Sequence, residues 1–360
     1  MASVEWGKYR IDDLFKIQTS AKRFDANKVN IIENGRYPYV VRTSSNNGQK
    51  GFLDENESFL NAGNTISFGQ DTATIFYQEK PYFTGDKIKV LVPKVYKFNK
   101  KNAQFFLASM NIAFSKFSWG SSRFNVDVLK EQVIMLPTKC DSIDFEFMES
   151  FIEELEAERI EELEAYLSVS GLKDTQLTAD ELSALDKFNS IKWKKFNLET
   201  LFGKSTRGKR LKGDDRIGGN LPFATAGETD EGISAFISND VEIFSSNTTT
   251  IDMFGSAKYR NYNYGADDHI AVVHTENLSK YAAIFVTSAC HKSAHNGDFS
   301  YSRNFYAKDA DKLYISLPVK NEQPDYELMS TLISAIQKLV IADVVKFSDE
   351  KIKATNQVVG

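Results

Sequence analysis

The 360-residue chain contains 44 Lys and Arg against 49 Asp and Glu, which gives a net charge of -5 at pH 7. A hydrophobic fraction of 42%, with 27 Phe and 15 Tyr, is typical of a globular protein, and the length suffices for two domains with separate cores. We expect no apolar run of the roughly 18 residues that a membrane span needs, and no signal peptide. Because the chain has only two cysteines, we expect a protein of the reducing cytoplasm.

The first predicted element is a globular domain over residues 1–138, which opens with WGKYRIDDLFKIQTSAKRF. A loop after the LF helical turn carries Lys22 and Arg23. Flexible cations in a loop can reach the phosphate groups of a nucleic acid. We therefore interpret these two residues as candidate phosphate contacts, with an ordinary exposed basic loop as the alternative.

Further along the same domain, VRTSSNNGQKG offers Arg42, Ser44, Asn46 and Asn47. Arg suits the acceptors of guanine, and Asn or Gln suits adenine, so this loop holds side chains that direct base reading uses. The alternative is a polar Asn-Gly turn that binds nothing. Later in the domain, SWGSSRF places Arg123 after small polar residues, as another candidate DNA contact.

A long helix is predicted from residues 142 to 168, where the chain has no Gly or Pro and many strong helix formers. Met148, Ile152 and Leu155 form an apolar stripe at spacings of three and four. The segment 139–191, which contains this helix and a connector, carries a net charge of -11. Such a segment either faces solvent or faces a basic protein.

The connector contains the sequence TADE, in which Thr178 and Glu181 have the spacing of a capping box. Leu182, Leu185 and Phe188 follow at helical spacing. The pattern predicts a short second helix at this place.

A second domain, predicted over residues 192–319, repeats the first. Its opening, WKKFNLETLFGKSTRGKRL, matches the start of the chain at an offset of 187 and supplies Lys209, Arg210 and Lys212 as candidate phosphate contacts. The counterpart of the polar loop is ATAGETDEG, which offers Thr225 and Glu228 instead of Arg and Asn. Arg303 in SYSRNF corresponds to Arg123.

The repeat ends with ISLPVKNEQPDYELM, which matches IMLPTKCDSIDFEFM at an offset of 181 and begins a second long helix within 320–360. Met329, Ile333 and Ile336 match Met148, Ile152 and Leu155. Equivalent stripes in a duplicated chain can meet across a pseudo-two-fold axis, so we expect an antiparallel coiled coil. The alternative is that each stripe packs on its own domain.

Catalysis by this chain is not expected. No GxxxxGK[ST] phosphate loop occurs, and the CHKSAH segment with Cys290, His291 and His295 lacks both the glutamate of a zinc protease and a fourth ligand. We therefore expect neither a metal nor another cofactor, and no enzymatic activity.

Two halves that each begin W…F/Y…LF, continue through T..KR, YP or LP and LP, and end in a long helix resemble the specificity subunit of type I restriction-modification systems. The connector GLKDTQLTADELSALDKF also resembles that of the related type IIB-like enzymes. The resemblance implies an α+β fold of two mixed, β-rich target recognition domains, whose following helices pair as an antiparallel coiled coil. Each domain would read half of a split target in double-stranded DNA.

The same resemblance implies partners. Methyltransferase subunits and a restriction subunit would dock on the chain and carry the adenine methyltransferase and endonuclease activities. The residues alone leave another interpretation open, in which the chain is a coiled-coil interaction scaffold that does not bind DNA.

Overall fold

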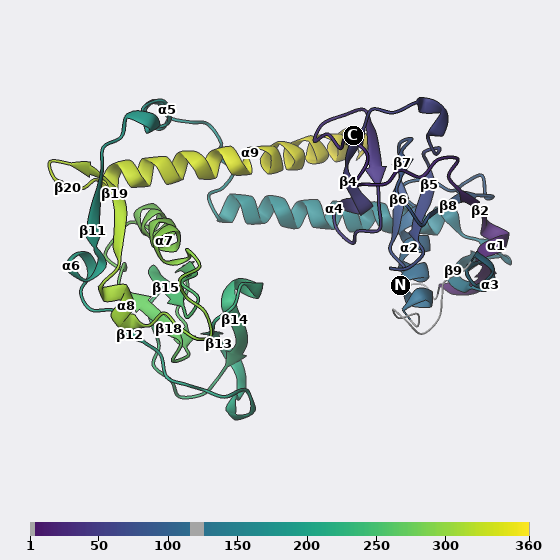
Figure 1. Cartoon of the computed structure of the whole chain (residues 1–360). Helices are drawn as coiled ribbons and strands as arrows, with labels where there is room; N and C mark the ends of the chain where they lie inside the picture. The colour runs from purple at the N-terminus through teal and green to yellow at the C-terminus, as the bar shows by residue number, and fades with distance from the viewer. Residues whose placement is uncertain (1–3, 116–125, 360) are drawn as a thin grey trace. The chain divides into compact units, whose positions relative to one another are not determined.

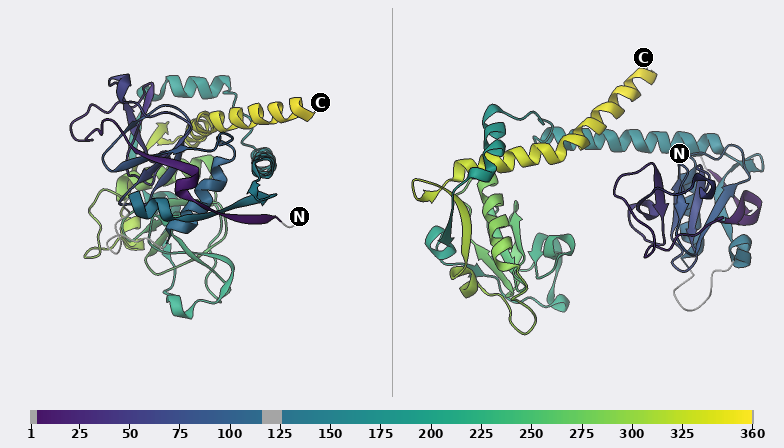
Figure 2. Two further views of the ribbon diagram at one scale, coloured as in Figure 1. Left: turned by 90° about the vertical axis from the view of Figure 1, so that its right-hand side faces the viewer. Right: turned by 45° about the horizontal axis from the view of Figure 1, so that its top comes forward.

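The computed structural model of the chain describes residues 4–115 and 126–359 (Figures 1 and 2). Two compact units are distinguished, Met1–Glu162 and Leu163–Gly360, and each has its own hydrophobic core. The boundary between the units falls within the first long helix. The finer division at residues 138, 191 and 319 stays a prediction.

The first unit consists of small sheets, short helices and the start of a long helix. Its strands are β1 (Glu5–Arg10), β2 (Phe15–Thr19), β3 (Tyr37–Val40), β4 (Gln49–Leu53), β5 (Thr65–Gly69), β6 (Ile75–Gln78), β7 (Phe83–Thr84), β8 (Ile88–Pro93), β9 (Val133–Lys139) and β10 (Ser142–Ile143). Its helices are α1 (Ile11–Leu14), η1 (Asn46–Gly48), η2 (Glu57–Phe59), α2 (Ala103–Phe114), α3 (Val126–Glu131) and α4 (Phe145–Val169). The sheet orders are β1-β9-β10, β2-β8-β5-β6 and β4-β3-β7.

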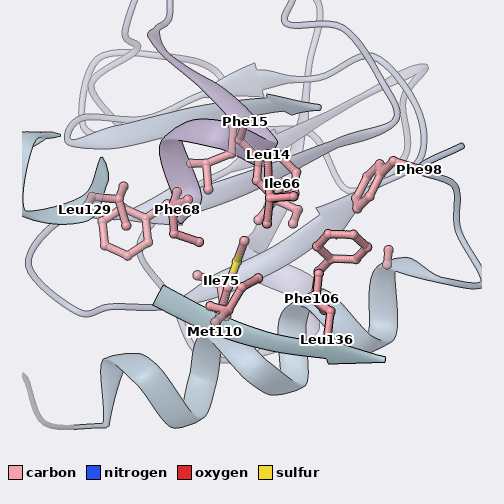
Figure 3. Packing of buried hydrophobic residues seen from close by; sticks show 14 of the residues in the cluster. Leu14, Phe15, Ile66, Phe68, Ile75, Phe98, Phe106, Met110, Leu129 and Leu136 are labelled. Atoms are coloured by element: carbon pink, nitrogen blue, oxygen red, sulfur yellow. The ribbon is translucent and has the colours of Figure 1, made fainter. Parts of the chain in front are cut away.

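The core of this unit lies between the β2-β8-β5-β6 sheet and α2 (Figure 3). Phe106 and Met110, one helical turn apart on α2, are fully buried against it. Phe15 from β2 meets Phe106 edge to face, with ring centroids 5.7 Å apart. Burying such aromatic side chains contributes about 1.5–3 kcal/mol each, which explains why α2 is fixed on this sheet.

The second unit has the same plan. Its strands are β11 (Trp193–Asn197), β12 (Thr206–Arg207), β13 (Gly218–Ala224), β14 (Ile233–Ile237), β15 (Thr248–Asp252), β16 (Ala257–Arg260), β17 (Gly265–Ala266), β18 (Ile270–Val273), β19 (Tyr314–Lys320) and β20 (Gln323–Pro324). Its helices are α5 (Ala179–Asp186), η3 (Phe188–Ser190), α6 (Leu198–Phe202), η4 (Gly213–Asp215), η5 (Thr229–Gly232), α7 (Lys280–Ala294), α8 (Ala307–Asp311) and α9 (Tyr326–Val359). The sheet orders β11-β19-β20, β12-β18-β15-β16 and β14-β13-β17 match those of the first unit, which confirms the predicted duplication.

The repeated LP sequences mark the junction between each domain and its long helix. Pro137 pairs with Trp6 in the register of β1 and β9, and Pro318 pairs with Trp193 in the register of β11 and β19. Asp144 accepts a hydrogen bond from the backbone N–H of Phe147 at 2.9 Å, and Asp325 accepts the equivalent bond from Leu328 at 3.0 Å. Each carboxylate satisfies a free N–H at the helix start.

The long helices α4 and α9 confirm the two predicted helices, but their first turns differ from the expectation. Met148 is fully buried in the core of the first domain and Met329 in the core of the second, so neither is available for a shared seam. Both residues lie in the first turn of their helix, which packs against the domain that precedes it. The pairing of the helices through the other stripe residues stays a prediction for Ile152, Leu155, Ile333 and Ile336.

One part of α9, Tyr326–Ala354, is long and apolar enough to cross a membrane by length and composition alone. This differs from the expectation that no such run exists. Core helices meet the same criterion, and α9 is held by polar groups as well as apolar ones. Ser279, the N-cap residue of α7, hydrogen-bonds to Ser330 of α9 at 2.7 Å, and Tyr281 of α7 to Gln337 of α9 at 3.2 Å.

The connector helix α5 starts with the predicted capping box. Thr178 Oγ1 accepts from the N–H of Glu181 at 3.2 Å, and Glu181 Oε2 accepts from the N–H of Thr178 at 2.8 Å. The same buried carboxylate binds α9, where it accepts from Ser334 at 2.6 Å and from Lys338 at 3.1 Å. The Ser334 hydroxyl, together with the Thr178 N–H and Lys338, lowers the pKa of Glu181 to about 2.

Replacing Glu181 by Gln is expected to weaken the attachment of α5 to α9 by about 1–3 kcal/mol at pH 7, because hydrogen bonds to a charged group are lost. The folded-state pKa lies below the ordinary value, so the stabilisation is complete above pH 4.5 and is lost as the pH falls towards 2. Urea unfolding followed by tryptophan fluorescence at pH 7 and pH 3 measures this. Asp186→Asn, at an exposed carboxylate of the same helix, is the control, and an equal Glu181→Gln effect at both pH values would contradict the assignment.

Candidate nucleic-acid interface

In the first domain, four chain segments line a depression of about 940 Å³. The turn between β5 and β6 contributes Thr72, and the other three segments are the loop after β2, the loop between β3 and β4 with the start of β4, and the turn between β7 and β8. The backbone joins them: Phe24 N donates to Thr84 O at 2.9 Å, and Gly85 N donates to Val40 O at 2.8 Å. The structure thereby brings the predicted residues Arg23 and Arg42 to the wall of a single depression.

The two arginines of this depression, Arg23 and Arg42, are paired with acids. Arg42 binds the Asp71 carboxylate at 2.5 Å, and Lys87 binds the same carboxylate at 2.7 Å. The Lys87 hydrogen bond, with the charge of Arg42, holds the pKa of Asp71 below its ordinary value. Arg23 binds Asp86 at 3.2 Å. Arg42 is therefore a guanidinium held in one orientation and still a third exposed.

Lys22 lies outside this depression. Its ammonium group lies 4.5 and 4.8 Å from the ring centroids of Phe24 and Phe59, and 3.7 Å from the carboxylate of Glu55. These contacts give Lys22 a structural role in covering the aromatic pair.

Asn46 and Asn47 form the turn η1 at the end of the loop. Their φ angles of 48° and 54° are left-handed, a conformation that Asn tolerates better than most residues. Asn46 Nδ2 donates to the carbonyl of Gln49 at 3.3 Å, and Asn47 Nδ2 donates to that of Tyr77 at 3.0 Å. Both amides hold the turn, as the alternative interpretation expected, whereas Ser44 is exposed.

The second domain has the same backbone hydrogen bond between the loop after its first sheet strand, β12, and the end of β17. Lys209 N donates to Ala266 O at 3.1 Å, as Phe24 N does to Thr84 O. Phe24 therefore holds the place of Lys209. The sequence match that pairs Lys22 with Lys209 is wrong, because the segment after β2 is longer than the one after β12.

The three cations predicted to contact phosphates in the second domain are not paired with acids in the described part of the chain. Lys209, Arg210 and Lys212 are exposed, and none has an ion-pair partner in residues 4–115 or 126–359. Between them and β12 stands Gly208, where a Cβ atom would lie 1.7 Å from Ala266 O. Only glycine allows the loop to approach β17 so closely, and this approach orders the backbone that presents the cations.

The loop after β13 differs in charge from the loop after β3, with Ala226 at the position of Arg42 and Glu228 at the position of Ser44. Its turn η5 has Asp230 and Glu231 at φ angles of 48° and 55°, matching Asn46 and Asn47. Thr225 lies at the start of the loop, half-buried, and its N–H donates to Gly232 O at 2.8 Å.

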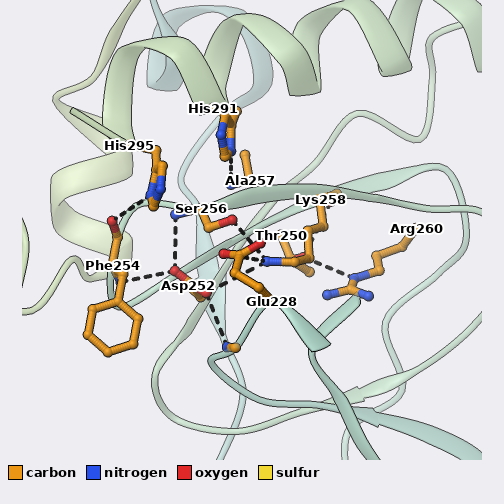
Figure 4. Close-up of polar contacts among 11 residues, drawn as sticks. Glu228, Thr250, Asp252, Phe254, Ser256, Ala257, Lys258, Arg260, His291 and His295 are labelled. Atoms are coloured by element: carbon orange, nitrogen blue, oxygen red, sulfur yellow. Dashed lines mark hydrogen bonds and ion pairs between the residues drawn. The ribbon is translucent and has the colours of Figure 1, made fainter. Parts of the chain in front are cut away.

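Glu228 in the same loop is exposed and is held from the β15–β16 hairpin (Figure 4). Lys258 Nζ lies 3.4 Å from the Glu228 carboxylate and 3.7 Å from Asp252, which is almost fully buried. A hydrogen bond from Ser256, followed by the Lys258 charge, lowers the pKa of Glu228. Glu228 is therefore an ionised acceptor in a fixed position.

A profile of the family described as "Type I restriction modification DNA specificity domain" matches residues 3–165 and 190–346. The chain belongs to this family. Family membership assigns it DNA sequence specificity in a restriction-modification complex and confirms the resemblance stated above, including the two mixed domains.

The chain is also similar to two known proteins. The chain is 26% identical over 346 residues to the type II restriction enzyme specificity subunit S.BcgI of Heyndrickxia coagulans, covering 94% of this chain and 96% of the relative. The crystal structure of a type I restriction-modification S subunit from M. genitalium shares the fold, with a TM-score of 0.61 and 17% identity over 99% of this chain and 95% of that one.

Arg303, which the repeat matches to Arg123 and which we predicted as a DNA contact, is exposed in a tight turn. Its backbone exchanges hydrogen bonds with Ser300 at 3.0 Å, and its guanidinium lies 5.3 Å from the ring centroid of Phe299. It borders a small depression with Tyr301 and Lys308. Arg123 lies outside the described residues.

The CHKSAH segment forms the end of α7 and does not gather ligands. Cys290 is fully buried, and burial raises the pKa of its thiol to about 12. His291 Nδ1 accepts from the N–H of Ala257 at 3.2 Å. Among the residues described, Asp267, Asp268 and His269 do lie together, but Asp267 already accepts from the N–H of Leu211 at 3.1 Å.

Sequence reasoning missed Arg260, a buried residue at the end of β16 that contacts Thr250 (Figure 4). It is 1% exposed, and its Nε donates to Thr250 Oγ1 at 3.0 Å. Its other end lies beside Gly232 of the turn. In the first domain Gln78 holds this place, donating to Ser67 Oγ and to Asn47 O at 3.1 Å each. Since Gln and Arg differ in type, comparing the repeats did not reveal the shared position.

Arg260→Ala is expected to destabilise the second domain by about 2–4 kcal/mol, because it leaves a cavity and removes the hydrogen bonds of the guanidinium to Thr250 and Tyr262. Arg260→Gln, which imitates Gln78 of the first domain, is expected to cost less. Thermal unfolding of the full chain measures both, with Arg303→Ala as an exposed control. If Arg260→Ala leaves the unfolding temperature unchanged, the buried guanidinium does not support the loop.

Proposed function

We propose that each domain reads one half-site of a bipartite DNA target, and that methyltransferase and restriction subunits bound to the chain perform the chemistry. The proposal rests on one observation: the two domains have the same backbone arrangement but different candidate contact residues. Two domains share strand order, a left-handed turn and a supporting residue below it, while the side chains on the loops differ. A shared frame with different loop residues fits two different half-sites.

The loop residues differ in the direction of hydrogen bonding. Arg42 has only donors, which suit O6 and N7 of guanine. Glu228 is ionised and has only acceptors, which suit the amino group of cytosine or adenine. The free cations Lys209, Arg210 and Lys212 suit phosphates, which carry no sequence information.

The competing interpretation is a scaffold that does not bind DNA. Methylation mapping of the genome in cells that express this chain with its methyltransferase subunit distinguishes the two. We expect a bipartite motif with methylated adenine to appear, and to disappear when the chain is deleted. If no motif depends on the chain, the proposed function is wrong.

Arg42→Ala and Glu228→Ala are each expected to relax recognition at one half-site and to leave the other unchanged, at about 1–3 kcal/mol for a lost bidentate contact. Binding of the assembled complex to a randomised bipartite library measures the base preference at every position. Arg36→Ala, which removes an exposed arginine of the same domain outside the depression, is the control. If both substitutions lower affinity for all sequences alike, these side chains do not read bases.

Lys209→Ala with Arg210→Ala is expected to weaken binding to every sequence and to reduce the slope of log affinity against log salt by about 1–2, because fewer counterions are released. The matched pair is Lys194→Ala with Lys195→Ala, at exposed cations of β11. A salt series on specific and random DNA measures the slope. A changed base preference without a changed slope would contradict phosphate contact.

A further inference from the structure

The first domain presents an arginine and an aspartate together beside its large depression. Asp71 lies in the turn between β5 and β6, where its neighbour Thr72 lines the depression, as Arg42 does. Arg42 Nη1 donates to Asp71 Oδ2 at 2.5 Å, and Lys87 Nζ donates to the same oxygen at 2.7 Å. Within residues 4–115 and 126–359, Nε and Nη2 of Arg42 and Oδ1 of Asp71 make no hydrogen bond. The pair therefore leaves two donor atoms and one acceptor unused.

A glycine at the end of β5 makes room for this arginine. A Cβ atom at Gly69 would lie 3.3 Å from Cγ of Arg42, which is closer than an ordinary contact. The strand registers match Gly69 to Asp252 of the second domain. They match Arg42 to Ala226. The first domain thus combines a glycine with a long loop side chain, and the second combines a larger residue with an alanine, so the place of Arg42 beside the turn is built into the first domain.

The second domain has a pair of the same kind, but there the residue on the hairpin is covered (Figure 4). Lys258 lies 3.4 Å from Glu228, and its side chain is 14% exposed, against 35% for Asp71. Lys258 also donates to Ser256 Oγ at 2.9 Å and lies 3.7 Å from the carboxylate of Asp252. Lys258 is therefore occupied in holding the loop, whereas Asp71 holds Arg42 and still has an exposed carboxylate with an unused oxygen.

The unused atoms match the hydrogen-bonding pattern of one kind of base pair. Along its major-groove edge, a G·C pair presents two acceptors, N7 and O6 of guanine, followed by one donor, the amino group of cytosine. An A·T pair presents an acceptor, a donor and an acceptor. Because Asp71 has a lowered pKa, it is ionised at pH 7 and can only accept. Two donors of Arg42 beside one acceptor of Asp71 complement the G·C pattern and not the A·T pattern.

We propose that Asp71 is a second base-reading residue of the first domain, and that the Arg42–Asp71 pair reads both bases of one G·C pair. Arg42 donates from Nε and Nη2 to guanine, and Asp71 Oδ1 accepts from the amino group of the cytosine on the other strand. Lys87 on the same carboxylate leaves the cluster with a net positive charge, which favours its approach to DNA. The inference rests on the proposed reading of DNA by this domain, and it names the base pair that the site takes.

The test uses the assembled complex and DNA from which single groups of one base pair are removed. The library selection with Arg42→Ala first identifies the base pair that Arg42 reads, which we expect to be G·C. At that pair, cytosine is replaced by 2-pyrimidinone, which lacks the amino group, or guanine by 7-deazaguanine, which lacks N7. We expect the unaltered complex to bind the amino-free DNA roughly tenfold more weakly than the target, the effect of one lost hydrogen bond to a charged group.

Asp71→Ala is expected to bind the target and the amino-free DNA with affinities within about twofold of each other, because no acceptor for the amino group remains. It should still bind the 7-deazaguanine DNA more weakly than the target, since Arg42 still reaches guanine. Glu57→Ala is the matched control, because it removes the acid of an exposed pair with Arg36 outside the depression. This control should keep the tenfold loss on amino-free DNA, and an unchanged preference at the second half-site shows that each complex is assembled.

The inference is overturned if the unaltered complex binds the amino-free DNA as tightly as the target, or if Asp71→Ala keeps the full loss. It is also overturned if Asp71→Ala becomes insensitive to both altered bases, because Asp71 then acts only by orienting Arg42, or if Glu57→Ala behaves like Asp71→Ala. A base pair other than G·C at the position that Arg42 reads overturns the inference and leaves the proposed function standing. If Arg42→Ala relaxes no base pair, both fail, so the two failures are distinguishable.

Discussion

The architecture depends on one repeated capping interaction. Asp144 and Asp325 each accept an N–H at the start of a long helix, directly after the short strand pair that closes the domain. A backbone bond from the same aspartate to the preceding proline carbonyl, 2.9 Å in both copies, ties the strand to the helix. Because these bonds fix the direction in which each helix leaves its domain, Met148 and Met329 are placed in the domain cores.

Much of this was predictable because the relevant signals are local. Both long helices, the capping box of Thr178 and Glu181, and the duplication itself follow from residue spacing. The assignment of Met148 and Met329 to a helix seam failed because a stripe with helical spacing does not show which neighbour it faces. In both repeats the first turn of the long helix packs against the core of its own domain, so its apolar residue is not left for the other helix.

The candidate site was less predictable, since its meaning depends on contacts between distant segments. Arg42 and Glu228 were identified by residue type, but the residues that hold them lie on other segments: Asp71 in the turn between β5 and β6, and Lys258 on β16. Asn46 and Asn47 had the composition of base-reading residues, yet the left-handed turn uses their amides. The pairing of Lys22 with Lys209 was wrong because the loop after β2 is longer than the loop after β12. The two sequences look alike, but equivalent backbone positions are shifted along the chain.

The buried residue below each turn has a consequence for how new specificities arise. Gln78 donates to the carbonyl of Asn47 in one domain, and Arg260 lies beneath Gly232 in the other. A turn transplanted without its own support would rest on a group of different length and charge. Contact residues and buried support are therefore expected to be inherited together, so that whole domains, rather than isolated loops, are the units that recombination can exchange.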